Sequence, residues 1–309
     1  MITGVGRLWV GWLGLLVFMT TSASAASTID PEVVKGEYIA RAAGCFTCHT
    51  DRKQKGKPFA GARPLKTFYG TFYTPNITPD PDTGIGKWSE QDFSRALREG
   101  VRPDGDYLYP VFPYTAYTKL RDDDVHALWV YLRSLAPVKQ ANRAHELRWY
   151  APPRFMVWFW QMLYFTPGRF QENPQKSATW NRGAYLVEAA AHCSECHTPR
   201  NVLGGVDTSL RFAGARNEEE DFVAPNITPA KNTGIDWSVS DLVTYFQIGL
   251  TPDGDSAGNI MADVIDDGLR HLTKQDLQAI AVYVRDLPPI EHSMRKAEKK
   301  TERKKEEWE

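Results

Sequence analysis

The chain has 309 residues, which is enough for two domains of ordinary size, each with its own hydrophobic core. Its formal net charge of -1, with 24% charged residues, argues against a nucleic-acid-binding protein, in which a basic surplus or stripe is expected. Aromatic residues make up 12% of the chain, a composition that suits the lining of a flat apolar cofactor as well as ordinary core packing.

The N-terminus has the pattern of an export signal. Arg7 is the only early charge, an apolar stretch runs from Leu8 to Met19, and small residues follow it. The A-x-A pattern that ends at Ala25 predicts cleavage there, so residues 1–25 are expected to be removed on export to the periplasm. An uncleaved anchor is the alternative, although the apolar stretch is shorter than the roughly 20 residues of a bilayer span.

Two five-residue phrases, residues 45–49 and 193–197, contain all four cysteines of the chain and both read C-x-x-C-H. In this spacing two thiols bond to the vinyl groups of one haem, while the adjacent histidine ligates the iron. The sequence therefore predicts two covalently bound haem c groups. The attachment residues are Cys45, Cys48, Cys193 and Cys196, and the iron ligands are His49 and His197.

Two C-x-x-C pairs can also form one four-cysteine zinc site, and a single pair can be a thioredoxin-like redox motif. Here each pair carries its own following histidine, and the pairs lie at equivalent points of a duplicated sequence. The apparent export of the chain also agrees with covalent haem. These features favour two haem sites over a zinc site or a dithiol redox centre.

An internal repeat with an offset of roughly 150 residues organises the chain. The stretch F-A-G-A-R at 59–63 recurs unchanged at 212–216, and P-N-I-T-P at 75–79 recurs at 225–229. Further matches precede both haem motifs and include a later P-D-G-D stretch. So many matches in one order predict two copies of one domain, at residues 30–138 and 181–290.

Each copy is predicted to consist of helices and loops. Capping patterns at helix starts are found at Asp30, Ser89, Asp122, Ser238 and Thr273. Apolar residues recur at helical spacing after several of these positions, and the Gly- and Pro-rich connections show no convincing strand alternation. We therefore expect an all-α fold with long loops.

Residues 139–180 have no counterpart in the second copy and are dense in aromatic side chains. The run from Phe155 to Phe165 is too short to span a membrane, so we interpret this segment as an inter-domain helix that packs on both domains. Contact with a membrane surface or a partner is the alternative. Residues 291–309 are mostly charged, with both signs, and are expected to form a solvated helix or a disordered tail.

The two predicted haem sites differ in the second axial ligand. Methionine in this position favours the reduced iron. Met261 lies six residues after Asp255 of the P-D-G-D stretch, and we predict that it ligates the second haem, with a role in core packing as the alternative. The same count from Asp106 reaches Phe112, which cannot ligate iron. Met156 is the first choice for the first haem, and the alternatives are an open iron, Met162, His126 or His145.

Two arginines and two tryptophans also fall at repeated positions. Guanidinium and indole N–H groups are good donors to haem propionates, although surface charge and core packing explain such residues equally well. The candidate propionate donors are Arg63, Arg216, Trp88 and Trp237.

The motifs resemble those of the multihaem cytochrome c subunits of bacterial periplasmic or membrane-associated dehydrogenases, such as alcohol-, gluconate- and aldehyde-oxidising enzymes. The matching stretches are P-N-I-T-P-D (75–80), T-G-I-G (83–86), L-Y-P (108–110), N-R-G-A-Y-L (181–186) and C-H-T-P-R (196–200). The resemblance implies two tandem class I-like cytochrome c domains joined by an aromatic-rich helical linker. It also implies electron transfer from a partner dehydrogenase to a quinone, another cytochrome or an oxidase.

This chain departs from the resemblance in two respects. Members of the alcohol dehydrogenase type commonly carry three haems and have methionine before Pro-Tyr in the first domain, whereas this chain has two haem motifs and Phe112. Electron transfer without substrate chemistry is the main hypothesis. The alternative is a dihaem enzyme, peroxidase-like or thiosulfate-oxidising, which needs a displaceable site at the first haem and acid–base groups beside it.

Overall fold

A computed structural model describes residues 30–217 and 222–294, together with Met1, Ile2, Gly4 and Gly6. Residues 7–25 of the predicted export signal, with its cleavage point, and residues 295–309 of the predicted tail lie outside the described residues. The described part is largely helical, as expected. It also contains two small antiparallel sheets, so the prediction of a purely α-helical fold is wrong in this respect.

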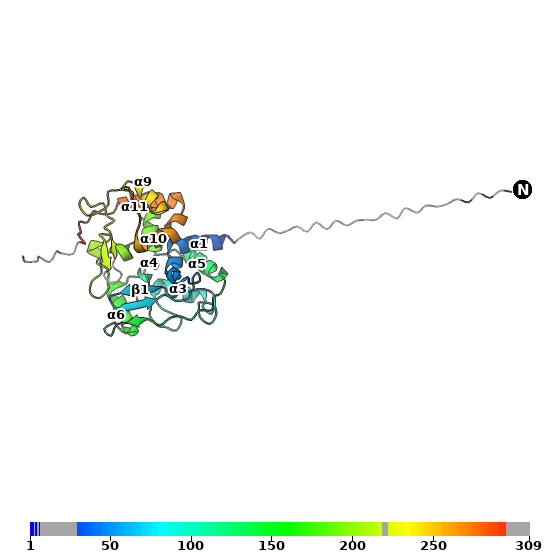
Figure 1. Ribbon diagram of the computed structural model, residues 1–309, viewed down its shortest axis with the longest axis horizontal. Coiled ribbons are helices and arrows are strands. Elements are labelled where there is room, and N and C mark those ends of the chain that lie inside the picture. The colour runs from blue at the N-terminus through cyan, green and yellow to red at the C-terminus, as the bar shows by residue number, and fades with distance from the viewer. Residues whose placement is uncertain (3, 5, 7–29, 218–221, 295–309) are drawn as a thin grey trace, which may run out of the picture.

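The long helices of the two halves follow one another in the same order. The first half contains α1 (Pro31–Ala42), α3 (Glu90–Glu99) and α5 (Asp122–Ser134). The second half contains α7 (Ala178–Tyr185), α9 (Val239–Ile248) and α11 (Lys274–Arg285). In each half the first helix packs against the last, α1 on α5 and α7 on α11. Figure 1 shows α9, α10 and α11 together at the top and α3, β1 and α6 below them.

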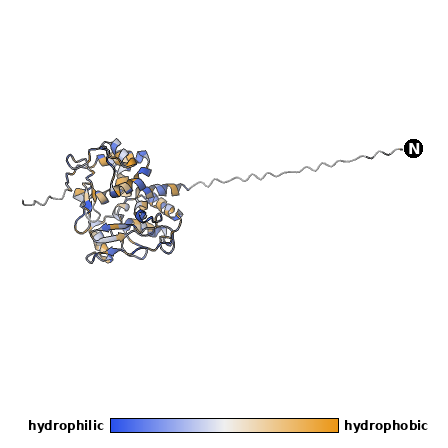
Figure 2. Ribbon diagram, viewed as in Figure 1, coloured by the Kyte–Doolittle hydropathy of each residue, from blue (hydrophilic) through white to orange (hydrophobic). Residues whose placement is uncertain are grey.

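Short helices and single turns connect the long ones. The short helices are α2 (Cys45–Cys48), α4 (Tyr114–Tyr117), α6 (Val157–Tyr164), α8 (Ser194–His197) and α10 (Asn259–Asp267). The single turns are η1 (Arg52–Gln54), η2 (Arg154–Met156), η3 (Leu186–Ala190), η4 (Thr208–Leu210) and η5 (Leu269–His271). Figure 2 shows both hydrophobic and hydrophilic residues among the helices, as expected when one face of a helix is buried.

The crossing of the first and last helix depends on a glycine in each half. A Cβ on Gly36 would stand 2.5 Å from the Cβ of Tyr131 and still closer to the backbone of Ala127. A Cβ on Gly183 would stand 2.9 Å from the Cβ of Tyr283 and would collide with the backbone of α11. Interiors have no room for such an atom, which explains why the G-x-Y pattern recurs before both haem motifs.

Most of the predicted helix caps are present. Ser89 and Ser238 form capping boxes, in which each hydroxyl accepts the N–H of the aspartate three residues later at 3.1 Å. The side chains of Asp30 and Thr273 cap α1 and α11. Asp122 is not the expected cap, because it is the first residue of α5, and its carboxylate instead pairs with Arg98 at 2.6 Å.

Each of the two sheets contains a hairpin that follows one C-x-x-C-H phrase, and the first sheet has a third strand from later in the chain. The first sheet joins β1 (Pro64–Thr67), β2 (Gly70–Tyr73) and β3 (Glu146–Leu147) in that order, and the second joins β4 (Ala215–Asn217) and β5 (Phe222–Ala224). These strands have two to four residues. A stretch of that length is too short to show a readable alternation of apolar and polar residues.

The aromatic segment at 139–180 is only partly helical. Its first residues supply β3 to the sheet of the first half, and α6 is the main helix within it. Gln161 of α6 donates to the carbonyl of Glu99 at 2.9 Å, and Trp160 donates to the carbonyl of Leu203 at 3.0 Å. The helix therefore touches both halves. Among the described residues, no helix combines the length and apolar character needed to cross a membrane.

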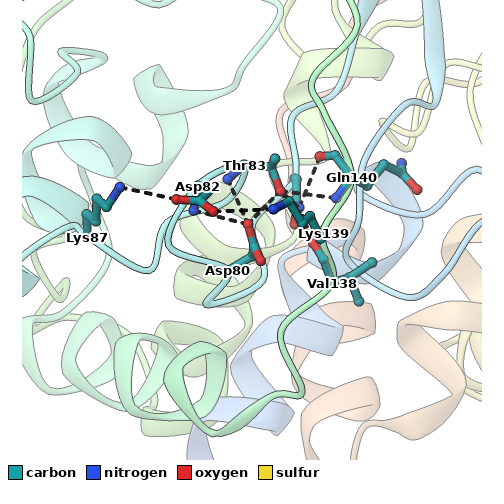
Figure 3. A network of polar contacts seen from close by, with 8 residues as sticks. Asp80, Asp82, Thr83, Lys87, Val138, Lys139 and Gln140 are labelled. Atoms are coloured by element: carbon teal, nitrogen blue, oxygen red, sulfur yellow. Dashed lines mark hydrogen bonds and ion pairs between the residues drawn. The ribbon is translucent and has the colours of Figure 1, made fainter.

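A set of hydrogen bonds closes the first half behind its last helix (Figure 3). Asn76, in the repeated P-N-I-T-P stretch, donates to the carbonyl of Val138 at 2.7 Å. Thr83 accepts the N–H of Gln140 at 3.1 Å, and its hydroxyl donates to Asp80 at 2.7 Å. The chain that leaves α5 is thereby fastened to the loop after the first haem motif.

The second half repeats these closing contacts. Asn226 donates to the carbonyl of Ile290 at 2.8 Å, and Thr233 accepts the N–H of His292 at 3.1 Å. The sequence places residues 291–294 in the charged tail, which is expected to be a solvated helix or disordered. They pack on the second half in the way that residues 139–142 pack on the first.

Gly36→Ala is predicted to lower the free energy of unfolding by about 1–3 kcal/mol, because the added methyl group overpacks the crossing of α1 and α5. Urea unfolding followed by far-UV circular dichroism measures this. Gly168→Ala is the matched control, since a Cβ there meets nothing within 4 Å. Equal stabilities for the two variants would contradict the close crossing.

Candidate cofactor-attachment sites

Each C-x-x-C-H phrase forms one tight helical turn after the first helix of its half. In the first half, α2 follows Gly44, whose φ of 64° lets the chain reverse between α1 and α2. In the second half, the turn α8 follows the π-helical turn η3. Because residues three apart share a face of a helical turn, the two cysteines of each pair lie on one side. This is the arrangement that bonds to one porphyrin.

The two histidines are held by equivalent hydrogen bonds, each to the carbonyl oxygen of a proline. Nδ1 of His49 lies 2.7 Å from the carbonyl oxygen of Pro75, and Nδ1 of His197 lies 2.7 Å from that of Pro225. A carbonyl oxygen can only accept, so Nδ1–H is the donor, and Nε2 keeps the lone pair that ligates a metal. Burial lowers the pKa of both histidines, which favours this neutral form.

A small frame of hydrogen bonds, donated by backbone N–H groups, surrounds each histidine. The carbonyl of His49 accepts the N–H of Gly61 at 2.8 Å, and the hydroxyl of Thr50 accepts the N–H of Phe59 at 3.1 Å. The carbonyl of Phe59 accepts the N–H of Ile77 at 2.9 Å. The second half repeats these bonds at 2.8, 3.1 and 2.9 Å, with the donors Gly214, Phe212 and Ile227. The repeated F-A-G-A-R and P-N-I-T-P stretches are therefore the frame of the histidines.

Gly61 is required for this frame by both its conformation and its surroundings. Its φ is 79°, and a Cβ would stand 2.5 Å from the carbonyl oxygen of Pro75, the atom that accepts from His49. Any larger residue would push on that carbonyl. The equivalent position of the second F-A-G-A-R stretch is also a glycine, Gly214, with a φ of 89°.

The cysteines are suited to attachment rather than to thiolate chemistry. Burial raises the pKa of Cys45 and of Cys193 to about 12, so these thiols stay protonated near neutral pH. Within the described ranges, no three His, Cys, Asp or Glu side chains gather as ligands for a metal ion. Paired cysteines beside a histidine with a lone pair on Nε2 are the donor set of a c-type haem, so both sites fit that group.

The two repeated arginines lie in different surroundings. Arg63 points into the molecule, where it donates to the carbonyl of Thr47 at 2.8 Å and to the carboxylate of Asp263 at 2.8 Å. Arg216 lies exposed on β4. The two repeated tryptophans, Trp88 and Trp237, pack against the hydrophobic core. A propionate-binding role for these four residues stays a prediction.

The candidate second ligands also lie in different surroundings. Met261 belongs to α10 and packs, half-buried, against the hydrophobic core. Phe112 packs against the ring of Tyr117, with the ring centroids 5.6 Å apart. Met156 is 43% exposed at the start of α6, and its turn is fastened by Arg154, which donates to the carbonyl of Tyr107 at 2.7 Å. Ligation by Met156 or Met261 stays a prediction.

The sequence does not predict that Tyr117 joins the segments just before the two C-x-x-C-H phrases. The hydroxyl of Tyr117 donates to the carbonyl of Ala43 at 2.6 Å, just before the first motif. Its ring stands 5.3 Å from that of His192, which precedes Cys193. Burial raises the pKa of Tyr117 well above its usual range, so the hydroxyl stays protonated as the donor. Ala43 and Tyr117 are 74 residues apart, and no local pattern pairs them.

Comparison with known proteins agrees with this geometry. The family model of cytochrome c matches residues 33–136. A diheme cytochrome c-type protein of Cereibacter sphaeroides is 42% identical over 294 residues, which cover 94% of this chain and 96% of that protein. The gluconate 2-dehydrogenase cytochrome c subunit of Pantoea cypripedii is 37% identical over 284 residues. The fructose dehydrogenase cytochrome subunit of Gluconobacter japonicus is 38% identical over 271 residues.

The match covers these relatives to different extents. The chain spans nearly all of the C. sphaeroides protein, but 63% of the gluconate subunit and 55% of the fructose subunit.

Gly61→Ala is predicted to displace the Pro75 carbonyl and so to weaken ligation by His49, while the second site is unchanged. Electron paramagnetic resonance of the ferric protein measures this as a loss of one of two low-spin signals. Gly105→Ala is the matched control, because Gly105 also has a positive φ, of 88°, but a Cβ there meets nothing. Two unchanged low-spin signals in Gly61→Ala would contradict the role given to this glycine.

Proposed function

Since this chain belongs to the family of c-type cytochromes that includes diheme cytochrome c and the cytochrome c subunits of dehydrogenases, we propose that it transfers electrons from a partner dehydrogenase to the respiratory chain. The observation that carries the proposal is the duplicated turn, in which paired cysteines precede a histidine held at 2.7 Å by a proline carbonyl. A bound haem supplies a one-electron couple. The protein attaches, orients and shields it.

We propose the following residues for the two sites. Cys45, Cys48 and His49 hold the first haem, and Cys193, Cys196 and His197 hold the second. Met261 is the second axial ligand at the second site, which its half-buried place in α10 supports. Met156 is the candidate at the first site. The hydroxyl of Tyr109 donates to the carbonyl of Pro152 at 3.2 Å, which supports this choice because it ties the stretch just before Phe112 to the stretch just before Met156.

We also propose that the two halves are tandem cytochrome c domains, with residues 139–180 between them. The matched helix crossings at Gly36 and Gly183 support this division, as do the matched closing contacts at Asn76 and Asn226. A shared fold with two attachment turns gives one cofactor to each domain.

The proposed place of action is the periplasm, with a dehydrogenase as donor and a quinone, a cytochrome or an oxidase as acceptor. The export pattern of residues 1–25 supports this place, because covalent haem is attached outside the cytoplasm. The names of the dehydrogenase subunits among the relatives support the choice of donor.

A peripheral membrane contact through α6 is part of the proposal. Exposed apolar side chains gather there and nearby: Phe68, Trp149, Phe155, Trp158, Phe159, Met162, Leu163 and Leu203. Exposed aromatic and apolar side chains match the headgroup region of a bilayer.

Met261→Ala is predicted to remove the methionine–sulfur charge-transfer band of the second haem and to lower its potential, because an iron without sulfur ligation is less easily reduced. Met156→Ala is predicted to do the same at the first haem. Ferric absorption spectra and redox titration measure both. If Met156→Ala leaves both haem spectra unchanged, the assignment of Met156 is wrong.

Carbon monoxide is predicted to leave the spectrum of the reduced protein unchanged, because both irons are expected to be six-coordinate. The measurement is a difference spectrum of the reduced protein with and without the gas. Rapid binding at the first haem would point to an open site there and would contradict a purely electron-transferring protein.

The double variant Trp158→Ser and Phe159→Ser is predicted to weaken binding to phosphatidylglycerol vesicles at least severalfold. Full burial of one large apolar side chain is worth about 1.5–3 kcal/mol, and partial insertion into a bilayer recovers a fraction of this. Vesicle co-sedimentation measures this. Ile248→Ser is the control, since Ile248 is an exposed apolar residue on α9, away from this patch. Equal binding by all variants would contradict a membrane contact through α6.

A further inference from the structure

The helix that carries Met261 is held by the other half of the molecule. α10 belongs to the second half by sequence, yet it packs against α2, the attachment turn of the first half. Its first turn has no side-chain cap, and Asn259 at its start has a positive φ of 50°. A short helix without a cap depends on outside contacts for its position.

The two faces of α10 make different kinds of contact. Residues four apart on a helix share a face, whereas residues two apart lie about 200° around the axis from each other. Met261 and Ile265 therefore share one face, which packs into the core, and Ile265 is 1% exposed. Asp263 and Asp267 share the opposite face, which meets charged groups of the first half.

Arg63 joins the first attachment turn to this acidic face. One nitrogen of its guanidinium donates to the carbonyl of Thr47, inside the first C-x-x-C phrase, at 2.8 Å. The other donates to the carboxylate of Asp263 at 2.8 Å. A planar guanidinium fixes the direction of both bonds, so it sets the distance between α2 and α10.

Two more arginines of the first half bind the end of the same helix. Arg52 pairs with the buried carboxylate of Asp267 at 2.7 Å, and Arg41 donates to the carbonyl of Asp267 at 3.3 Å. A Cβ on Gly268 would stand 2.8 Å from the carbonyl of Arg41, so the chain behind α10 also lies against α1. The helix is thus fastened at both ends of its acidic face.

We propose that Arg63, assisted by Arg52, is a positioning residue for Met261, and that the first half of the molecule thereby holds the second axial ligand of the other half in place. The proposal rests on the proposed ligation of the second haem by Met261. It makes the stability of that ligation depend on contacts around the first attachment turn.

The experiment measures how fast imidazole replaces the methionine ligand in the ferric, doubly loaded protein. Arg63→Gln is expected to speed the replacement at the second haem roughly threefold to fivefold, the effect of losing one partly exposed ion pair. Asp263→Asn is expected to give the same change, and the double variant no more than either, because both remove one interaction. Arg63→Lys, which can still pair with Asp263, is expected to recover part of the loss.

Arg270→Gln is the matched control. Arg270 pairs with Asp266 of α10 at 3.0 Å, so this variant also removes an arginine–aspartate pair from the helix, but one that lies within the second half. It is expected to leave the rate unchanged. An unchanged rate in Arg63→Gln, or an equal change in Arg270→Gln, overturns the proposal. Should Arg63→Gln fail to load two haems, Arg52→Gln tests the same prediction at an exposed side chain.

Further outcomes distinguish a failure of the positioning role of Arg63 from a failure of the ligand assignment of Met261. If Met261→Ala keeps the charge-transfer band of the second haem, Met261 is not the ligand, and both proposals about it fail. If Met261→Ala removes the band while Arg63→Gln leaves imidazole exchange unchanged, only the positioning role fails. A change confined to the first haem in Arg63→Gln would show that this arginine serves its own site, as a propionate donor, and would also overturn the proposal.

Discussion

The hydrogen bond from each motif histidine to a proline carbonyl is the interaction on which the rest of the structure depends. It selects the tautomer that leaves Nε2 ready for iron, and it brings the P-N-I-T-P loop against the attachment turn. That loop must pass close to the F-A-G-A-R stretch, and Gly61 provides the room. Asn76 in the same loop then binds the chain behind α5. The hydrogen bond that orients the histidine ring thereby also fixes the loop that follows the motif and the chain behind the last helix of that half.

The halves are joined by polar contacts rather than by a simple linker. Tyr38 of α1 donates to Asp276 of α11 at 2.6 Å, and Lys119 pairs with Glu188 at 2.9 Å. Tyr117 connects the segments that precede the two C-x-x-C-H phrases. Several of these groups are wholly or largely buried, where an unpaired partner would be costly. The relative placement of the two sites is therefore fixed by complementary groups from both halves.

The duplicated halves differ most clearly where they meet. Arg63 faces α10, whereas its counterpart Arg216 lies exposed. Phe112 stands where the second copy has Met261, and it packs on Tyr117 beside the second motif. A repeat copies local structure, but only one copy of each residue can occupy the interface. The divergence at these positions follows from the asymmetric contact between two similar halves.

The sequence by itself determined the features that depend on near neighbours. Spacing within a few residues located both C-x-x-C-H phrases, and it located the Ser89 and Ser238 caps because a cap and its partner are three residues apart. Only the tertiary structure showed the strands, which are too short for a pattern, and the contacts of Arg63 with Asp263 and Tyr117 with Ala43. Groups 200 and 74 residues apart meet only when the chain folds, so no local pattern predicts these contacts.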